Sequence, residues 1–155
     1  MAVNRRLLAV LVLVAALAAL VVSTPAGASD ETTKCTAATV LKPGNEVPPS
    51  GSKAFGAALV HINGTQLSFS VAIVNPARES FFAGHIHVGA AGVNGPVQVT
   101  LFSGSTDRRL IVQAAQLEIA ETLATAICAN PAGYYVNYHT TDFPGGAVRG
   151  QLNEL

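Results

Sequence analysis

Charged residues, cysteine and long apolar segments are all scarce in this sequence. Nine basic and nine acidic residues among 155 give a formal net charge of zero. Nucleic-acid-binding surfaces need clustered Lys and Arg, so this balance excludes an electrostatic nucleic-acid partner. The long apolar run, from Leu7 to Val22, has sixteen residues. A helix needs roughly 20 to cross a bilayer, and we therefore expect no membrane span in the processed protein.

The first 28 residues have the three-part pattern of a secretory signal peptide. Arg5 and Arg6 precede the apolar run, and Ala26-Gly27-Ala28 follows it as an A-x-A-like cleavage site. We predict removal of residues 1–28 and a secreted or extracytoplasmic location in the cell envelope. The arginine pair leaves twin-arginine export open beside ordinary secretion. The remaining 127 residues suit one domain, predicted at 36–155 after a flexible segment at 29–35.

Cys35 and Cys128 are the only two cysteines, and both follow the predicted cleavage site. In an oxidising compartment an even pair is most simply a disulfide. Two separate free thiols remain the alternative at this point.

Alternation of apolar and polar residues predicts antiparallel strands. Residues 54–62 and 66–74 flank Asn63-Gly64, a dipeptide that a type I′ hairpin turn prefers. In the second run alternate apolar residues, from Leu67 to Ile73, share one face. The remaining strands are predicted at 35–42, 81–88, 96–102, 134–140 and 147–152.

One helix is predicted from about Ala114 to Ala129, after a polar loop at 103–109. Apolar residues recur there at helical spacing, and Asn130-Pro131 ends the pattern. Six or seven short strands and one helix predict a mainly β protein, an antiparallel Greek-key-like β-sandwich.

Three histidines are candidates for a metal site. His85 and His87 flank one residue, so on a strand both imidazoles point to the same face, roughly 6–7 Å apart. His139 lies on another predicted strand. Such a pair with a distant third histidine is how β proteins commonly bind copper or zinc. The alternative is that the rings form structural hydrogen bonds, and His61 is predicted to be a partly exposed strand residue.

Three further residues are candidates for supporting either the site or the fold. Asn137 lies on the same strand face as His139, and Asp142 follows His139 closely enough to orient an imidazole. Arg149 has two interpretations. It either bridges to a carboxylate such as Asp142 or to loop carbonyls, or it guides an anion toward a metal.

The residues that commonly serve as nucleophiles give no catalytic pattern. Ser80 and Ser103 lack the Gly-x-Ser-x-Gly turn that exposes a hydrolase nucleophile. Glu118 and Glu121 fall on the surface of the predicted helix. We therefore assign no catalytic residue.

Several segments, taken in order, closely resemble the CHRD domain family, which is named from repeats in chordin and also occurs as single exported bacterial domains. They are GHIHVG at 84–89, GVNGPV at 92–97, YYVNYHT at 134–140 and FPGGAVRGQL at 143–152. The turn GNEVPP at 44–49 fits the same pattern, and the resemblance covers about residues 36–152. The order of the histidines, the glycine pair and Arg149 is also loosely similar to copper/zinc superoxide dismutases.

The resemblance implies an extracellular module, because the chordin repeats belong to an extracellular protein that binds signalling ligands. We therefore predict a secreted binding or structural module without catalytic activity, with an extracellular protein or surface ligand as partner. The alternative is a copper- or zinc-binding protein that uses His85, His87 and His139, with redox activity like that of a superoxide dismutase.

Overall fold

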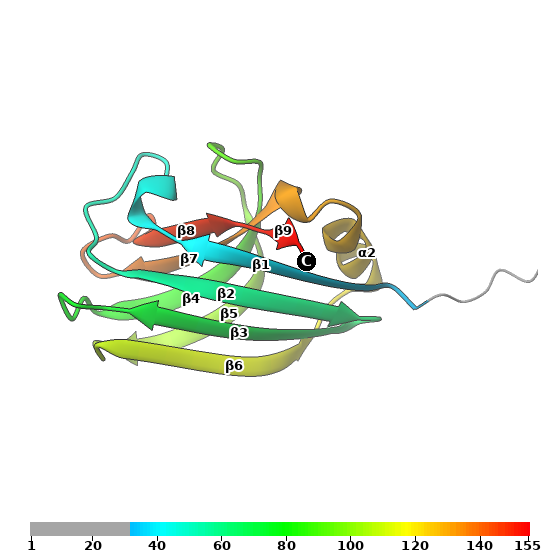
Figure 1. The fold of residues 1–155 in the computed structure, drawn as a ribbon, viewed down its shortest axis with the longest axis horizontal. Coiled ribbons are helices and arrows are strands. Elements are labelled where there is room, and N and C mark those ends of the chain that lie inside the picture. Colours follow the sequence, from blue (N-terminus) through cyan, green and yellow to red (C-terminus); the bar gives the residue numbers. More distant parts are fainter. Residues whose placement is uncertain (1–31) are drawn as a thin grey trace, which may run out of the picture. The chain divides into compact units, whose positions relative to one another are not determined.

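Two antiparallel sheets pack face to face in the computed structural model, which describes residues 32–155 (Figure 1). Sheet A has the strand order β6-β3-β2-β1-β9, and sheet B has the order β5-β4-β7-β8. The predicted mainly β sandwich with one helix is confirmed for these residues. The elements are β1 (Lys34–Leu41), η1 (Pro43–Asn45), β2 (Phe55–Asn63), β3 (Gln66–Val74), β4 (Phe81–Val88), β5 (Val97–Thr106), β6 (Leu110–Glu118), α2 (Glu121–Ala129), η2 (Pro131–Gly133), β7 (Tyr134–Thr140), β8 (Val148–Gln151) and β9 (Asn153–Glu154).

The core lies between the two sheets and follows from the alternation in the sequence. On β3, Leu67 and Ile73 are fully buried, and the residues between them on the other face are more exposed. Ile86 of β4 and Val136 of β7 meet them from sheet B and are also fully buried. Burial of these side chains contributes roughly 1.5–3 kcal/mol for each large aliphatic group.

The first hairpin turns one residue later than predicted. Asn63 pairs with Gln66, so the loop consists of Gly64 and Thr65. Gly64 has a φ of 61°, whereas Thr65 does not have a positive φ. A type II′ turn places glycine at the first central position, so this turn is of type II′ rather than the predicted type I′.

The segment before α2 also differs from the prediction. Residues 114–118 belong to β6, which pairs with β3 from Gln66↔Glu118 to Val74↔Leu110, and the helix begins only at Glu121. Strand β5 likewise extends to Thr106, into the predicted polar loop. Strand β6 pairs with β3 along its whole length and buries Ile111 in the core, and this tertiary packing overrides the helical spacing.

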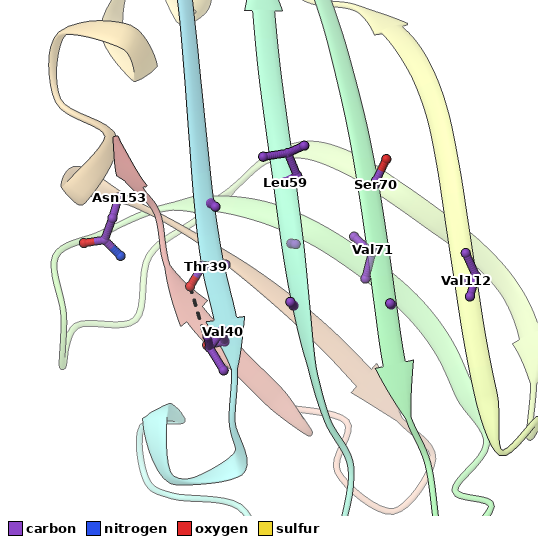
Figure 2. Close-up of a pocket in the computed structure, with 11 residues that line it drawn as sticks. Thr39, Val40, Leu59, Ser70, Val71, Val112 and Asn153 are labelled. Atoms are coloured by element: carbon purple, nitrogen blue, oxygen red, sulfur yellow. Dashed lines mark hydrogen bonds between the residues drawn. The ribbon is translucent and has the colours of Figure 1, made fainter. Parts of the chain in front are cut away.

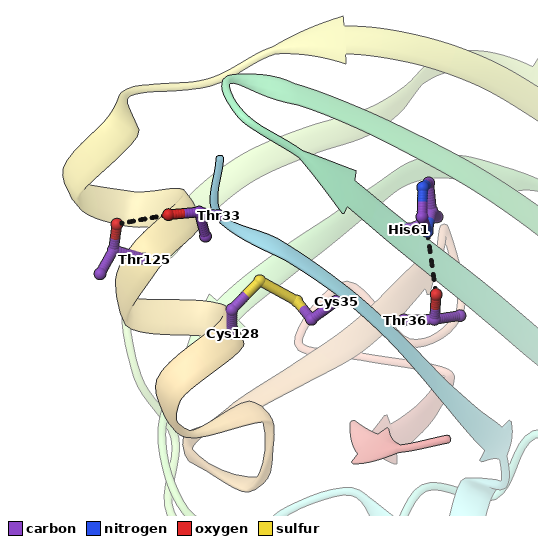
Figure 3. The surroundings of a disulfide bond; sticks show 6 residues. All are labelled: Thr33, Cys35, Thr36, His61, Thr125 and Cys128. Atoms are coloured by element: carbon purple, nitrogen blue, oxygen red, sulfur yellow. Dashed lines mark hydrogen bonds between the residues drawn. A yellow bond between two sulfur atoms is a disulfide. The ribbon is translucent and has the colours of Figure 1, made fainter. Parts of the chain in front are cut away.

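A disulfide joins Cys35 of β1 to Cys128 of α2, with the Cα atoms 5.5 Å apart (Figure 3). The predicted disulfide is thus confirmed. Beside it, the hydroxyls of Thr33 and Thr125 lie 3.3 Å apart. The flexible segment predicted at 29–35 is corrected at its end, because pairing with β2 places Lys34 and Cys35 in β1.

The predicted signal peptide, residues 1–28, lies outside the described residues. Among the residues that the structure describes, no helix is long and apolar enough to span a membrane.

Candidate metal centre

The outer face of sheet B carries the three histidines identified in the sequence. On β4, Ile86 points into the core between the sheets, so the alternating His85 and His87 point to the opposite face. On β7, Tyr138 belongs to the core, and the next residue, His139, points outward. Strands β4 and β7 are antiparallel neighbours, and this pairing brings residues 54 positions apart together.

The three imidazoles form one cluster. His85 Nδ1 lies 3.2 Å from His139 Nε2. One ring nitrogen from each histidine lies within 4.8 Å of the other two. The ring centroids are 5.1 Å apart for His85 and His139, 5.5 Å for His85 and His87, and 6.0 Å for His87 and His139.

Two backbone carbonyls set the orientation of two of the rings. His87 Nδ1 lies 2.8 Å from the carbonyl oxygen of Gly95, and His139 Nδ1 lies 3.0 Å from that of Pro144. A carbonyl oxygen can only accept, so both Nδ1 atoms carry the proton and both Nε2 atoms hold a lone pair. His87 Nε2 is buried and has no hydrogen-bond partner.

Burial keeps all three rings uncharged at neutral pH. Desolvation lowers the pKa of His139 to about 4, and the neighbouring His85 and His87 lower it further while the bond to Pro144 opposes the shift. Desolvation also lowers the pKa of His85 and of His87. Neutral imidazole is the form that binds a metal, so the cluster is ready to do so without first losing a proton to water.

Loops cover this outer face and explain why its polar groups are buried. His87 and His139 are each only 8% exposed, although they point away from the core. Residues 89–96 lie over His87, and the turn at 141–147 lies over His139, as their carbonyl bonds show. His85 is only half-buried, so the cluster stays open to solvent on its side.

Arg149 holds the loop at 89–96 in place. Its Nη2 donates to the carbonyls of Ala90 and Val93, at 3.1 and 2.8 Å. Its guanidinium carbon lies 3.4 Å from the ring centroid of Tyr135, and that ring stacks on His87 at 4.9 Å. The side chain is 1% exposed. Of the roles predicted for Arg149, these contacts match the bond to loop carbonyls.

A buried carboxyl group reaches the same face from the turn at 43–49. Glu46 is 5% exposed, and Asn137 Nδ2 donates to its Oε2 at 3.4 Å. A side chain at Gly146, where φ is 144°, would overlap this carboxyl group, so glycine is required there. Desolvation raises the pKa of Glu46 to about 7, although Arg149 opposes the shift. Glu46 Oε1 and Asn137 Oδ1 are both buried without a partner.

Two other candidates do not join the cluster. Asp142 is exposed in the turn after β7, and within residues 32–155 no hydrogen bond or ion pair links it to a histidine or to Arg149. His61 lies on β2 of the other sheet, where its Nδ1 lies 2.9 Å from the hydroxyl of Thr36 (Figure 3).

Sequence reasoning missed the groups that the loops supply. The orienting carbonyls of Gly95 and Pro144 have no side-chain signature, although both residues lie in the segments that resemble the CHRD family. Glu46 was visible only as an isolated carboxylate in a proline-rich turn. Next to it, Asn94 Nδ2 donates to the carbonyl of Val47 at 2.7 Å and links the two loops.

The arrangement is suited to binding one borderline-soft metal ion. Imidazole nitrogen is a ligand for copper and zinc, and three protein ligands leave a fourth position open. A tetrahedral ion with bonds of 2.0–2.1 Å places its ligand atoms about 3.3 Å apart. The 3.2 Å between His85 and His139 already meets this requirement. The other two separations, within 4.8 Å, would need to shorten by about 1.5 Å at most.

The sequence model of the CHRD domain family matches residues 37–152. No curated protein and no solved structure matches the chain, so the looser likeness to superoxide dismutases gains no support.

Proposed function

The chain belongs to the CHRD domain family, and we propose that it is an exported binding module that holds one copper or zinc ion on His85, His87 and His139. The match to the family supports a binding or structural role. The three-histidine cluster gives that role a ligand of defined chemistry.

The observation that carries the proposal is the unpaired Nε2 of His87. A buried nitrogen that gives up water without gaining a partner costs about 1–3 kcal/mol. Here the carbonyl of Gly95 occupies Nδ1, and this forces the lone pair of Nε2 into the cluster. A metal ion would use that lone pair and remove the cost.

Ion binding would change the hydrogen bonding of one ring. In the metal-free cluster, His139 Nδ1 donates to Pro144, so Nε2 must accept the contact from His85 Nδ1. To bind an ion through Nδ1, His85 must move this proton to its own Nε2. The ring of His85 is only half-buried, so water is available to accept a bond from that nitrogen.

Export fits both the sequence and the disulfide. Residues 1–28 have a signal-peptide pattern, and a disulfide persists in an oxidising compartment. We propose that residues 36–155 act there as one domain.

Metal uptake tests the proposal. Protein with its disulfide intact is treated with a chelator, loaded with Zn²⁺ or Cu²⁺, desalted and examined by elemental analysis. We expect one equivalent of metal per chain. The variant His87→Ala should bind at least about 100-fold more weakly, since loss even of an outer orienting partner costs 10–100-fold.

The matched control is His61→Ala, which removes a histidine from the other sheet and should leave uptake unchanged. Absence of stoichiometric uptake, or uptake that survives His87→Ala, would reject the metal site. A melting temperature that does not respond to chelator or metal would then favour the second candidate, a metal-free module for an extracellular partner, which the family match supports.

A further inference from the structure

The outer face of sheet A is the one large sheet surface that no described segment covers. Six of the ten exposed large hydrophobic side chains lie on it: Val40, Phe55, Leu59, Val74, Leu110 and Val112. The most exposed of these six, Val112, is 69% accessible, and Leu59 is 42% accessible. Soluble monomers rarely leave a contiguous apolar surface of this kind uncovered.

Strand register arranges this face in rows. One row is Val40–Ala57–Ala72–Val112, and the next is Ala38–Leu59–Ser70–Ala114. A third row, Phe55–Val74–Leu110, lies beside the first. None of these row positions carries a charge. The exposed Lys42, which directly follows Leu41 of β1, borders the third row at Phe55, and Lys34 and Glu118 lie at the far end of the strands.

Large and small side chains stand next to each other on this face. Leu59 projects from β2 and Val112 from β6, and between them Ser70 and the two central alanines form the floor of a hollow of about 560 Å³ (Figure 2). The surface therefore offers a ridge at Leu59 beside a mostly apolar groove on the same sheet face.

We propose that a second copy of this chain packs against the outer face of sheet A, related by a two-fold axis. Such an interface must be complementary to itself, and the ridge at Leu59 can enter the groove over Ala57 and Ala72 of the other copy. Two identical charged faces would repel each other, whereas the three apolar rows bring no like charges together. A partner recognised by charge would find no charge on these three rows.

The area is sufficient for a stable dimer. Strands of eight or nine residues at about 3.4 Å per residue, spaced about 4.8 Å apart, give four strands a face of about 30 by 19 Å. This area includes the polar rows at the far end, up to Lys34 and Glu118, as a rim around the three apolar rows. With that rim, the pair would bury about 1,100 Å², just above the roughly 1,000 Å² that a specific interface needs. We therefore expect a dimer with micromolar rather than nanomolar affinity.

Sedimentation velocity between about 1 and 500 µM tests the proposal on the exported, disulfide-bonded protein, with its N-terminus checked by mass spectrometry. The sedimentation coefficient should rise with concentration from the monomer to the dimer value. The variants Leu59→Lys and Val112→Lys each place two like charges in the buried pair. Each should raise the dimer dissociation constant at least about tenfold.

The matched control is Val97→Lys, an equally apolar-to-charged change on the edge strand of sheet B, which should leave dimerisation unchanged. Near-ultraviolet circular dichroism checks the folding of each variant, and two variants on separate strands guard against a local defect. A monomer across the whole concentration range overturns the proposal, whether the face is bare or covered by another segment or protein. A dimer that survives both lysine variants overturns it as well. Metal content has no part in this test, so its outcome is independent of the proposed metal site.

Discussion

Removal of the Cys35–Cys128 disulfide should cost this domain a large part of its stability. The bond links residues 93 positions apart, so about three quarters of the described chain lies in the loop that it closes. Chain-entropy reasoning assigns a loop of that length about 4–5 kcal/mol, because the bond restricts the unfolded ensemble. Domains of this size are commonly stable by only about 5–15 kcal/mol.

The perturbation is the double variant Cys35→Ala, Cys128→Ala. Equilibrium unfolding in urea is followed by far-ultraviolet circular dichroism, because the chain has no tryptophan. We expect the free energy of unfolding to fall by about 3–5 kcal/mol. The dependence on urea should become steeper, since the unlinked unfolded chain exposes more surface. Chemical reduction of the unchanged protein should give the same loss.

The matched control is Thr125→Ala, which removes a hydrogen bond with Thr33 at the same junction of β1 and α2. This exposed pair should contribute no more than about 0.5 kcal/mol. A loss below about 1.5 kcal/mol with an unchanged urea dependence would refute the reasoning. It would mean that the unfolded chain already holds the two ends of the domain together.

Four further predictions concern stability. His139 has a pKa of about 4 in the native protein and 6.5 in the unfolded chain, so the unfolded chain binds the proton first as the pH falls. In urea unfolding, the metal-free protein should therefore lose stability as the pH falls from 6.5 to 4, and His139→Asn should lose less. Glu46 has a pKa of about 7 in the native protein and 4.5 in the unfolded chain, so the unchanged protein should lose stability as the pH rises from 4.5 to 7. Glu46→Gln should abolish this loss, which is measured by comparing the free energy of unfolding at pH 5 and pH 8. In Gly84→Ala the new methyl group would overlap the ring of Tyr138, and thermal unfolding should show a cost of about 1–3 kcal/mol. Arg149→Lys breaks the paired carbonyl bonds and should cost about 2–3 kcal/mol in urea unfolding.

Sequence patterns were sufficient to locate three of the strands with correct bounds. The predicted bounds of 66–74, 81–88 and 134–140 agree with β3, β4 and β7. The largest error lay at 114–118, where alanine, leucine, glutamine and glutamate favour a helix. There the choice depended on the open edge of β3, which is a tertiary property that local spacing does not contain.

The candidate site was predictable only in part for a similar reason. The period of a strand alone places His85 and His87 on one face, and pairing of β4 with β7 adds His139. The tautomers of His87 and His139 depend on the carbonyls of Gly95 and Pro144. A pattern of side chains in the sequence does not indicate which backbone carbonyl will contact a ring.

The loops at 89–96 and 141–147 bury and orient the histidines on the outer face of sheet B. All seven residues of β7 are buried, which requires cover on both sides of sheet B. If the loop at 89–96 were displaced, His87 would bond to water at both nitrogens and its pKa would lose the lowering that burial provides. Its lone pair would then have no fixed direction. Arg149 keeps the loop in place by holding Ala90 and Val93, and its charge adds to the lowering of the pKa of His87. Within residues 32–155 no such loop covers the outer face of sheet A, and its apolar side chains stay exposed there.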